Sequence, residues 1–426
     1  MDQQDVRYQT YIEILKKELV PAMGCTEPVA LAYCAAKARA VLGQRPQRVV
    51  IEASGNIIKN VKSVIVPNTD GRKGIEAAAA IGIVAGREDL ELEALSLVTE
   101  EQKADFQVYM ETAAFSVRQA ESSRLLDMTV RVYREDSYAV VRIADTHTNI
   151  VHIEKDGKIL LHKETGEQTR QNIPDYSLLT VQGIYDFAQS VDMDAIQPIL
   201  EKQILYNTAI SAEGLKKDYG ANIGSVLLET YGSDVRNRAK ARAAAGSDAR
   251  MNGCELPVII NSGSGNQGMT VSLPVIEYAE ELQADREKLY RALVISNLTA
   301  IHQKTGIGSL SAYCGAVSAG AGAGAGIAYL RGGGYEEIAH TIVNALAITS
   351  GIICDGAKAS CAAKIATAVD VGIFGYDMYL KGQQFYSGDG VVSAGVEKTI
   401  QNIGRLGKDG MRETDKEILC IMTCVD

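Results

Sequence analysis

The spacing of apolar residues changes twice along this 426-residue chain, and that change is the strongest constraint on its fold. Apolar positions recur at helical spacing over residues 6–42, with a break at residues 21–24. Strand-like runs begin at Arg48, and residues 128–163 hold runs that alternate or carry β-branched residues, typical of an antiparallel meander. After Pro174 almost the whole pattern is helical.

This order predicts an α+β fold class. A mainly helical domain would comprise residues 1–45 and 172–426, and a smaller α+β domain with an antiparallel sheet would be inserted at residues 46–171. Within the insert, RVVIEAS and VKSVIVP resemble strands, IEAAAAIGIVAG predicts an alanine-rich helix, and a charged helix is expected around residues 88–108. The polar stretch at residues 163–175 is the expected linker.

Charge and composition exclude several kinds of partner. The chain has 53 acidic residues against 43 Lys and Arg, a formal net charge of −10, which argues against nucleic-acid or anionic-membrane partners. Its first residues, MDQQDVRYQT, lack the basic and apolar regions of a signal peptide, so we expect a cytoplasmic protein. In that reducing compartment the eight cysteines are expected to be thiols and not disulfides.

One segment of the chain has the length of a membrane span. Residues 305–330 contain no charged side chain and are long enough to cross a bilayer. Alanine and glycine dominate the segment, however, and neither a basic cluster nor an aromatic belt flanks it. Small residues let helices approach closely, so we expect a buried helix in a tightly packed bundle and no membrane partner.

Cys25 lies where a thiol can be reactive. It precedes Thr26, a favourable helix N-cap, and Pro28 falls in the first helical turn. A thiol at a helix N-terminus faces the positive end of the helix dipole, which lowers its pKa. The position predicts a nucleophile or base, and the alternative is a buried thiol in a tight turn. Cys34 and Cys254 lie in apolar surroundings and are expected to be structural.

Three other cysteines form the most informative set. Asp355-Gly356 is a turn dipeptide and Ser360 is a suitable N-cap, so Cys354 and Cys361 are expected to line a short loop that Cys314 reaches from another helix. Three thiols suit a metal shell with one open position, whether for zinc or for a cubane iron–sulfur cluster. Their spacing matches neither a zinc CxxC pattern nor a ferredoxin run, so three buried small thiols are the alternative.

Several polar motifs supply candidate substrate-binding groups. The loop NSGSGNQG (261–268) offers backbone N–H groups to an anion, unless it is a plain flexible turn. In DTHTNIVHIE, His147 is a candidate to hydrogen-bond a substrate, whereas His152 is expected on the opposite strand face. SGNIIKN and SDARM are either binding motifs or simple caps and ion pairs. The candidate substrate-binding residues are Asn56, Lys59, His147, Thr148, Asn149, Ser262, Ser264 and Asn266.

GCTEP, HTNIVHIE, SDARM, NSGSGNQG and CDGAKASC occur in an order that resembles the L-cysteine desulfidase family, which is related to the iron–sulfur L-serine dehydratase alpha chains. The resemblance covers nearly the whole chain. It implies a [4Fe-4S] lyase without pyridoxal phosphate that converts L-cysteine and water to hydrogen sulfide, pyruvate and ammonia. It further implies that Cys314, Cys354 and Cys361 hold the cluster and that Cys25 accepts a proton. In some relatives a terminal cysteine caps the fourth iron, a position that Cys424 matches here.

Other functions stay open at this point. An iron–sulfur L-serine dehydratase would use the same chemistry on a substrate of almost the same size. A pyridoxal-phosphate lyase would use SGSGN to hold its cofactor, although no lysine lies in a recognisable Schiff-base motif. A non-catalytic metal- or redox-binding protein is the third alternative. Cys420 and Cys424 are four residues apart, which favours one face of a final helical turn over a pair of metal ligands. The expected partner is a small amino acid, and assembly into a homo-oligomer is left open.

Overall fold

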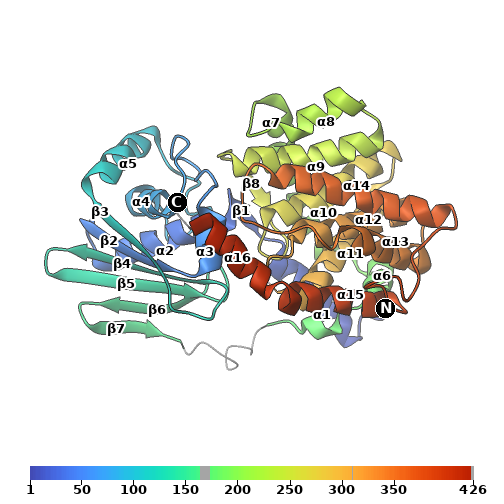
Figure 1. Ribbon diagram of the computed structural model, residues 1–426, viewed down its shortest axis with the longest axis horizontal. Coiled ribbons are helices and arrows are strands. Elements are labelled where there is room, and N and C mark those ends of the chain that lie inside the picture. The colour runs from blue at the N-terminus through green and yellow to red at the C-terminus, as the bar shows by residue number, and fades with distance from the viewer. Residues whose placement is uncertain (164–172, 309, 424–426) are drawn as a thin grey trace.

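A computed structural model describes residues 1–163, 173–308 and 310–423 (Figure 1). A mixed sheet with helices on one face lies at one side of the molecule, and a helical bundle lies at the other. This is the α+β architecture expected from the apolar spacing. Helix α1 (Val6–Glu18) packs on the bundle, although the whole sheet region follows it in the sequence before the other bundle helices begin.

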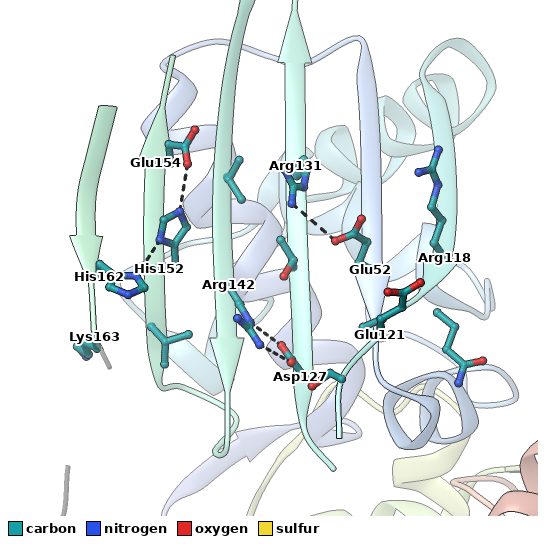
Figure 2. A pocket seen from close by; sticks show the side chains of 16 residues that line it. Glu52, Arg118, Glu121, Asp127, Arg131, Arg142, His152, Glu154, His162 and Lys163 are labelled. Carbon is teal, nitrogen blue, oxygen red and sulfur yellow. Dashed lines mark hydrogen bonds and ion pairs between the residues drawn. The ribbon is translucent and has the colours of Figure 1, made fainter. Parts of the chain in front are cut away.

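Within the described ranges the large sheet has six strands in the order β3-β2-β4-β5-β6-β7. β2 and β3 are parallel and the other neighbours are antiparallel, so β4 to β7 form the meander predicted for residues 128–163. Along β4, Val130 and Val132 are buried, while Arg131 points to the opposite face (Figure 2). The strands are β2 (Arg48–Ala53), β3 (Ala114–Gln119), β4 (Asp127–Arg134), β5 (Ser137–Ala144), β6 (Ile150–Lys155) and β7 (Lys158–His162).

Helices α2 (Thr26–Leu42) and α4 (Ile75–Ala85) pack together, and α2 lies on β4 and β5. They approach closely because α4 is rich in small residues: a Cβ on Gly82 would lie 2.2 Å from the carbonyl oxygen of Ala32. Residues 1–45 were predicted to belong to the helical domain. Helix α1 does pack on the bundle, whereas α2 packs on the sheet. The domain boundary at residue 45 stays a prediction.

The bundle is built around α12 (Gly315–Leu330), which packs against α10, α11, α13 and α14. A Cβ on Gly320 would lie 2.4 Å from the carbonyl oxygen of Ala368, so small residues do allow backbones to meet. The buried helix is as expected, and none of the described helices is long and apolar enough to cross a membrane. The other bundle helices are α6 (Val181–Ser190), α7 (Met193–Lys216), α8 (Ile223–Tyr231), α9 (Val235–Met251), α10 (Gly265–Glu281), α11 (Arg286–Ile307), α13 (Tyr335–Thr349), α14 (Cys361–Leu380) and α15 (Val396–Arg405).

Short elements join the sheet region to the bundle. β1 (Pro21–Met23) pairs antiparallel with β8 (Pro257–Ile259). Helix α16 (Arg412–Thr423) crosses from the bundle to the sheet region and packs on α3 (Gly55–Val61) (Figure 1). There the buried ammonium of Lys59 pairs with Asp415. Because α3 forms part of the cavity described below, α16 fixes one of its walls.

Two local predictions were wrong. VKSVIVP does not form a strand in the described structure, where α3 ends at Val61 and Ile65 makes an isolated bridge with Lys73. The charged helix expected around residues 88–108 begins later, as a 3-10 turn, η1 (Glu91–Glu93), followed by α5 (Glu100–Thr112). The parallel edge strand β3 was not predicted, because its half-exposed side chains do not alternate clearly between apolar and polar.

Candidate active site

Helices α2, α10, α12 and α14 begin around one small cavity of about 110 Å³ between the sheet region and the bundle. Each helix N-terminus presents backbone N–H groups and the positive end of a dipole, so the cavity favours anionic groups. The residues predicted from sequence that line it are Cys25, Asn56, Lys59, His147, Ser262, Ser264, Asn266, Cys314, Cys354 and Cys361.

Cys25 is itself the N-cap of α2, one residue before the expected cap at Thr26. The side chain is 3% exposed. Burial raises the pKa of the thiol well above its usual value, the Glu27 carboxylate adds to this shift, and Arg250 opposes it. The predicted lowering of the pKa was therefore wrong, because desolvation of the thiolate outweighs the helix dipole.

Glu27 connects Cys25 to the other polar groups of the cavity. Its carboxylate accepts hydrogen bonds from the Cys25 thiol at 3.2 Å, the Thr26 hydroxyl at 3.0 Å and the Asn60 amide at 3.0 Å. The Nε2 atom of His147 lies 3.9 Å away, too far for a hydrogen bond but close enough for electrostatic attraction. Burial raises the pKa of this carboxyl, yet His147 and Cys25 outweigh burial and bring it to about 2. A thiol therefore lies beside a buried carboxylate.

Cys314 and Cys354 are neighbours because backbone hydrogen bonds pair their segments. The Cys314 N–H donates to the Ile352 carbonyl at 3.1 Å, and the Cys354 N–H donates to the Ala312 carbonyl at 2.6 Å. Cys314 is the N-cap of α12 and Cys361 is the first residue of α14, so the expected break between Cys354 and Cys361 is confirmed. Burial raises the pKa of Cys314 to about 12, with Cys354 adding to the shift, and burial also raises the pKa of Cys361.

Asp355 organises the loop that carries two of these cysteines. Its carboxylate forms ion pairs with Lys358 and Lys364. Gly356 has a φ of 93°, and a Cβ there would lie 2.5 Å from the Lys59 carbonyl oxygen, so the loop can approach α3 only with glycine at this position. The two lysines place positive charge beside the thiols.

The cysteines and a buried lysine fit a thiolate-bound cluster. Among the described residues, no three His, Cys, Asp or Glu side chains are arranged to hold a single metal ion. A cubane cluster requires less convergence, because each thiolate binds a different iron atom. Lys304 is 6% exposed, burial lowers its pKa, and no described side chain pairs with its ammonium group. The Lys304 side chain lies close enough to Cys314 and Cys354 that it would balance part of the negative charge of an anionic cluster held there.

The NSGSGNQG loop leads from β8 to the start of α10, as expected. Ser264 is the N-cap of α10 and accepts from the N–H of Gln267. Ser262 has a φ of 50°, and its hydroxyl donates to the neighbouring Asn261 side chain at 2.9 Å. The Asn266 side chain accepts from a buried arginine of α9. The loop is therefore an ordered wall of the cavity.

His147, Thr148 and Asn149 lie in the turn between β5 and β6, but their side chains have different surroundings. His147 lines the small cavity. Thr148 lines an adjoining cavity of about 790 Å³, which shares His147 and Lys304 with the small one. The Asn149 amide donates to the Ala144 carbonyl at 3.0 Å and closes the turn. Of the three, His147 is placed to meet a ligand in the small cavity.

Helix α3 supplies two predicted residues with different surroundings. Lys59 is 2% exposed, and its ammonium is held by Asp415. The Oδ1 atom of Asn56 is buried and has no hydrogen-bond partner in the described part of the chain. Asn56 is thus free to accept from a ligand, whereas Lys59 already fulfils a structural role.

Sequence analysis missed polar residues that complete the cavity: Glu27, Arg250, Gln267 and Lys304. Nε and Nη2 of Arg250 and Oε1 of Gln267 are buried and lack hydrogen-bond partners among the described residues. Their local sequence carries no distinguishing signal, because charged and amide side chains are ordinary in helices. SDARM was noted as a motif, but its arginine was not singled out.

A larger cavity of about 640 Å³ lies on the uncovered face of the sheet (Figure 2). Arg142 there forms a two-pronged ion pair with Asp127, at 2.8 and 2.6 Å. His152 contacts Glu154 at 3.3 Å and His162 at 3.3 Å. The separation of His152 from His147 is as predicted. Arg142 of β5 is paired with Asp127 of β4, and His152 of β6 contacts His162 of β7.

The other cysteines lie away from the small cavity. Cys34 is fully buried and its thiol donates to the Val141 carbonyl at 3.4 Å. Cys254 is 4% exposed, and Cys420 lies on the exposed side of α16. Cys424, the proposed cap of a fourth iron, lies outside the described residues.

The fold and the site define an α+β protein with a thiol-lined cavity between a sheet and a helical bundle. Residues 89–420 match the family described as "Serine dehydratase alpha chain", and the chain belongs to that family. A UPF0597 protein of Desulfitobacterium hafniense is 62% identical over 99% of this chain and 98% of its own length. UPF0597 proteins of Lachnoclostridium phytofermentans and Treponema denticola are 55% and 46% identical, over 97% and 98% of this chain and 99% and 98% of theirs. The resemblance to the dehydratases is confirmed, and desulfidase activity stays a prediction.

Proposed function

We propose that this protein is an L-cysteine desulfidase that uses a [4Fe-4S] cluster to release hydrogen sulfide, pyruvate and ammonia from L-cysteine. The observation that supports the proposal is the meeting of Cys25 with Cys314, Cys354 and Cys361 at one buried cavity. The cavity is small and has convergent polar groups, which suits a small amino acid better than a peptide or nucleotide.

Cys314, Cys354 and Cys361 would hold the cluster, and Lys304 and Lys364 would balance its negative charge. When bound, such a cluster supplies a Lewis-acidic iron with an open position, which makes the substrate sulfur a better leaving group. The lysines are placed for this role because both interact electrostatically with the thiols.

Cys25 is the proposed acceptor of the Cα proton. In the elimination, the electron pair of the Cα–H bond forms the Cα=Cβ bond, and sulfur leaves with the electrons of the Cβ–S bond. Cys25 rests as a thiol hydrogen-bonded to Glu27, so it would first release its proton to solvent and then take the Cα proton as a thiolate. A substrate ammonium group arriving beside Glu27 would add the positive charge that favours the thiolate. The aminoacrylate product then tautomerises, and water hydrolyses the imine to pyruvate and ammonia.

Anaerobic reconstitution tests the proposal directly. Iron and acid-labile sulfide are measured first, and sulfide and pyruvate released from L-cysteine are measured next. About four irons per chain and equal amounts of both products are expected. Fewer than about three irons would contradict the cubane cluster, and a fully loaded protein that releases no sulfide would contradict the activity.

The Cys25→Ala variant tests whether Cys25 acts as the base or as a cluster ligand. It should abolish turnover and leave the iron content unchanged, because Cys25 is not assigned to the cluster. Loss of iron together with activity would instead place Cys25 among the ligands. Cys34→Ala is the matched control, since it removes another buried thiol of α2 outside the cavity and should retain both iron and turnover.

L-Serine dehydration is the second candidate, favoured by the description of the matching family. The same residues would act, with hydroxide leaving in place of hydrosulfide. The ratio of kcat/KM for the two amino acids decides between them, and a preference for L-serine would contradict the desulfidase proposal.

A further inference from the structure

Arg250 is 2% exposed, lies in the last turn of α9 and lines the small cavity. Its Nη1 atom donates to the Asn266 side chain at 3.1 Å. Its Nε and Nη2 atoms are buried without a hydrogen-bond partner among the described residues. Burying a guanidinium whose N–H groups lack hydrogen-bond acceptors is unfavourable in free energy. An anionic ligand from outside the chain would supply those acceptors.

Other arginines of the same helix show how α9 satisfies a guanidinium in a structural role. Arg238 and Arg242 both pair with Glu277 of α10, at 3.1 and 2.9 Å. Arg250 has no such ion pair within the described part of the chain, although it is more deeply buried than either of them. The difference is that Arg250 faces the cavity.

The guanidinium of Arg250 packs against the first residue of α10. A Cβ on Gly265 would lie 2.3 Å from Arg250 Nε and 2.8 Å from Cζ, so glycine allows this contact. The N-terminus of this 17-residue helix adds its N–H groups and its dipole at the same place. A carboxylate matches such a site, because Nε and Nη2 can bind both of its oxygens in one plane.

The remaining groups of the cavity complement the rest of an amino acid. Glu27 is a buried carboxylate, and Oε1 of Gln267 is a buried acceptor without a partner among the described residues. Both suit an ammonium group. Within the small cavity of about 110 Å³, these groups lie close enough together to meet one small molecule.

We propose that Arg250, together with the N-terminus of α10, binds the α-carboxylate of the substrate and so restricts the site to small α-amino acids with a free carboxylate. The inference rests on the proposed function for the reaction that follows, but the binding step can be measured without turnover.

The test measures binding of L-alanine, which has no leaving group, to the reconstituted holoenzyme by calorimetry. L-Alaninamide, which lacks the carboxylate, is the matched probe. Wild-type protein should bind L-alanine and should bind the amide at least about tenfold more weakly. Arg250→Met should weaken L-alanine binding by about 10- to 100-fold, and Arg250→Lys should weaken it less because one charge remains.

Two further variants make the result specific. Gly265→Ala pushes a methyl group into the guanidinium and should weaken L-alanine binding without removing a charge. Arg242→Met removes an arginine of the same helix outside the cavity and should leave binding unchanged. For L-cysteine, Arg250→Lys should raise KM much more than it lowers kcat, with the iron content unaltered.

Equal affinity of the wild type for L-alanine and L-alaninamide would overturn the inference, as would unchanged L-alanine binding by an iron-loaded Arg250→Met protein. If L-alanine binds through Arg250 but the wild type releases no sulfide from L-cysteine, the carboxylate site stands and the proposed reaction fails. The two proposals can therefore fail separately.

Discussion

The cavity on the sheet face and the small cavity between sheet and bundle differ in whether their central arginine has a carboxylate partner. On the sheet face, the partly exposed Arg142 side chain forms an ion pair with the buried Asp127 carboxylate (Figure 2). The small cavity buries Arg250 and Lys304 without an anionic partner among the described residues. Paired charges stabilise the fold by themselves, whereas unpaired buried charges are costly until a ligand arrives. The sheet-face cavity is several times larger, so volume alone does not identify the site.

Neutralising one carboxylate in each region should give the largest difference between the two cavities. Glu27→Gln should lower sulfide release on the order of 100-fold, because the variant loses the charge that orders Cys25 and an incoming ammonium group. Glu154→Gln on the sheet face should keep activity within about twofold. Iron content is measured for both, and near-wild-type turnover by Glu27→Gln would remove Glu27 from the proposed site.

Removing an arginine should lower thermal stability on the sheet face but not in the small cavity. Asp127 is 2% exposed, so Arg142→Met leaves a buried carboxylate unpaired and should cost about 2 kcal/mol, seen as a Tm lower by a few degrees. Arg250→Met should not lower Tm, because it removes unmet donors. Differential scanning calorimetry of both reconstituted proteins makes the comparison, and a larger loss for Arg250→Met would contradict it.

The effect of Arg142→Met should also depend on pH. Burial raises the pKa of Asp127, but Arg142 outweighs burial and holds it below its usual value. A carboxyl with a lowered folded-state pKa stabilises the fold above its unfolded pKa, and that contribution is lost as pH falls through the folded value. The Tm difference between wild type and variant should therefore be full at pH 7 and shrink below about pH 4. A difference that grew towards acid pH would contradict this assignment.

The two histidines of HTNIVHIE offer a smaller test within one motif. His147 lies 3.9 Å from Glu27, and His147→Gln should lower activity about tenfold by removing its electrostatic support. His152→Gln, on the sheet face, should leave activity unchanged. Steady-state assays of both variants decide, and equal effects would mean that the motif does not divide between the two regions.

Asp248 gives the smallest expected effect and extends the comparison to a buried carboxylate without a cation. Burial raises its pKa to about 6, although Gly224 donates a backbone hydrogen bond to it. A carboxyl with a raised folded-state pKa stabilises the fold below its unfolded pKa, and this contribution is lost as pH rises through about 6. Asp248→Asn should therefore raise stability more at pH 8, where the aspartate is charged, than at pH 4.5. Thermal unfolding at both pH values tests it.

The sequence revealed those parts of the site that depend on local chemistry. The turn dipeptide before Cys361, the capping position near Cys25 and the Ser/Gly/Asn loop before α10 fix helix starts within a few residues, so the thiols were found. The sheet meander was predicted for the same reason, because alternation and turns are local signals. The strand predicted at VKSVIVP was wrong because β-branched residues also suit a buried loop.

Glu27, Arg250 and Lys304 could not be found in this way. A charged residue in a helix is ordinary, and what distinguishes these three is burial beside the cavity, which only the packed structure reveals. The lowered pKa expected for Cys25 failed for a related reason. Helix position is visible in a sequence, whereas the desolvation that outweighs it is a property of the whole fold.

The contacts between the sheet region and the bundle join residues that are far apart in the sequence, and this determines when the cavity can form during translation. The Thr26 hydroxyl oxygen lies 2.9 Å from the Gly263 carbonyl oxygen, 237 positions later, and Lys59 pairs with Asp415, 356 positions later. During translation, the residues around Cys25 leave the ribosome long before the cysteines that they face. The cavity cannot be complete until the bundle has been synthesised, so any metal-delivery system would have to act on the nearly finished chain.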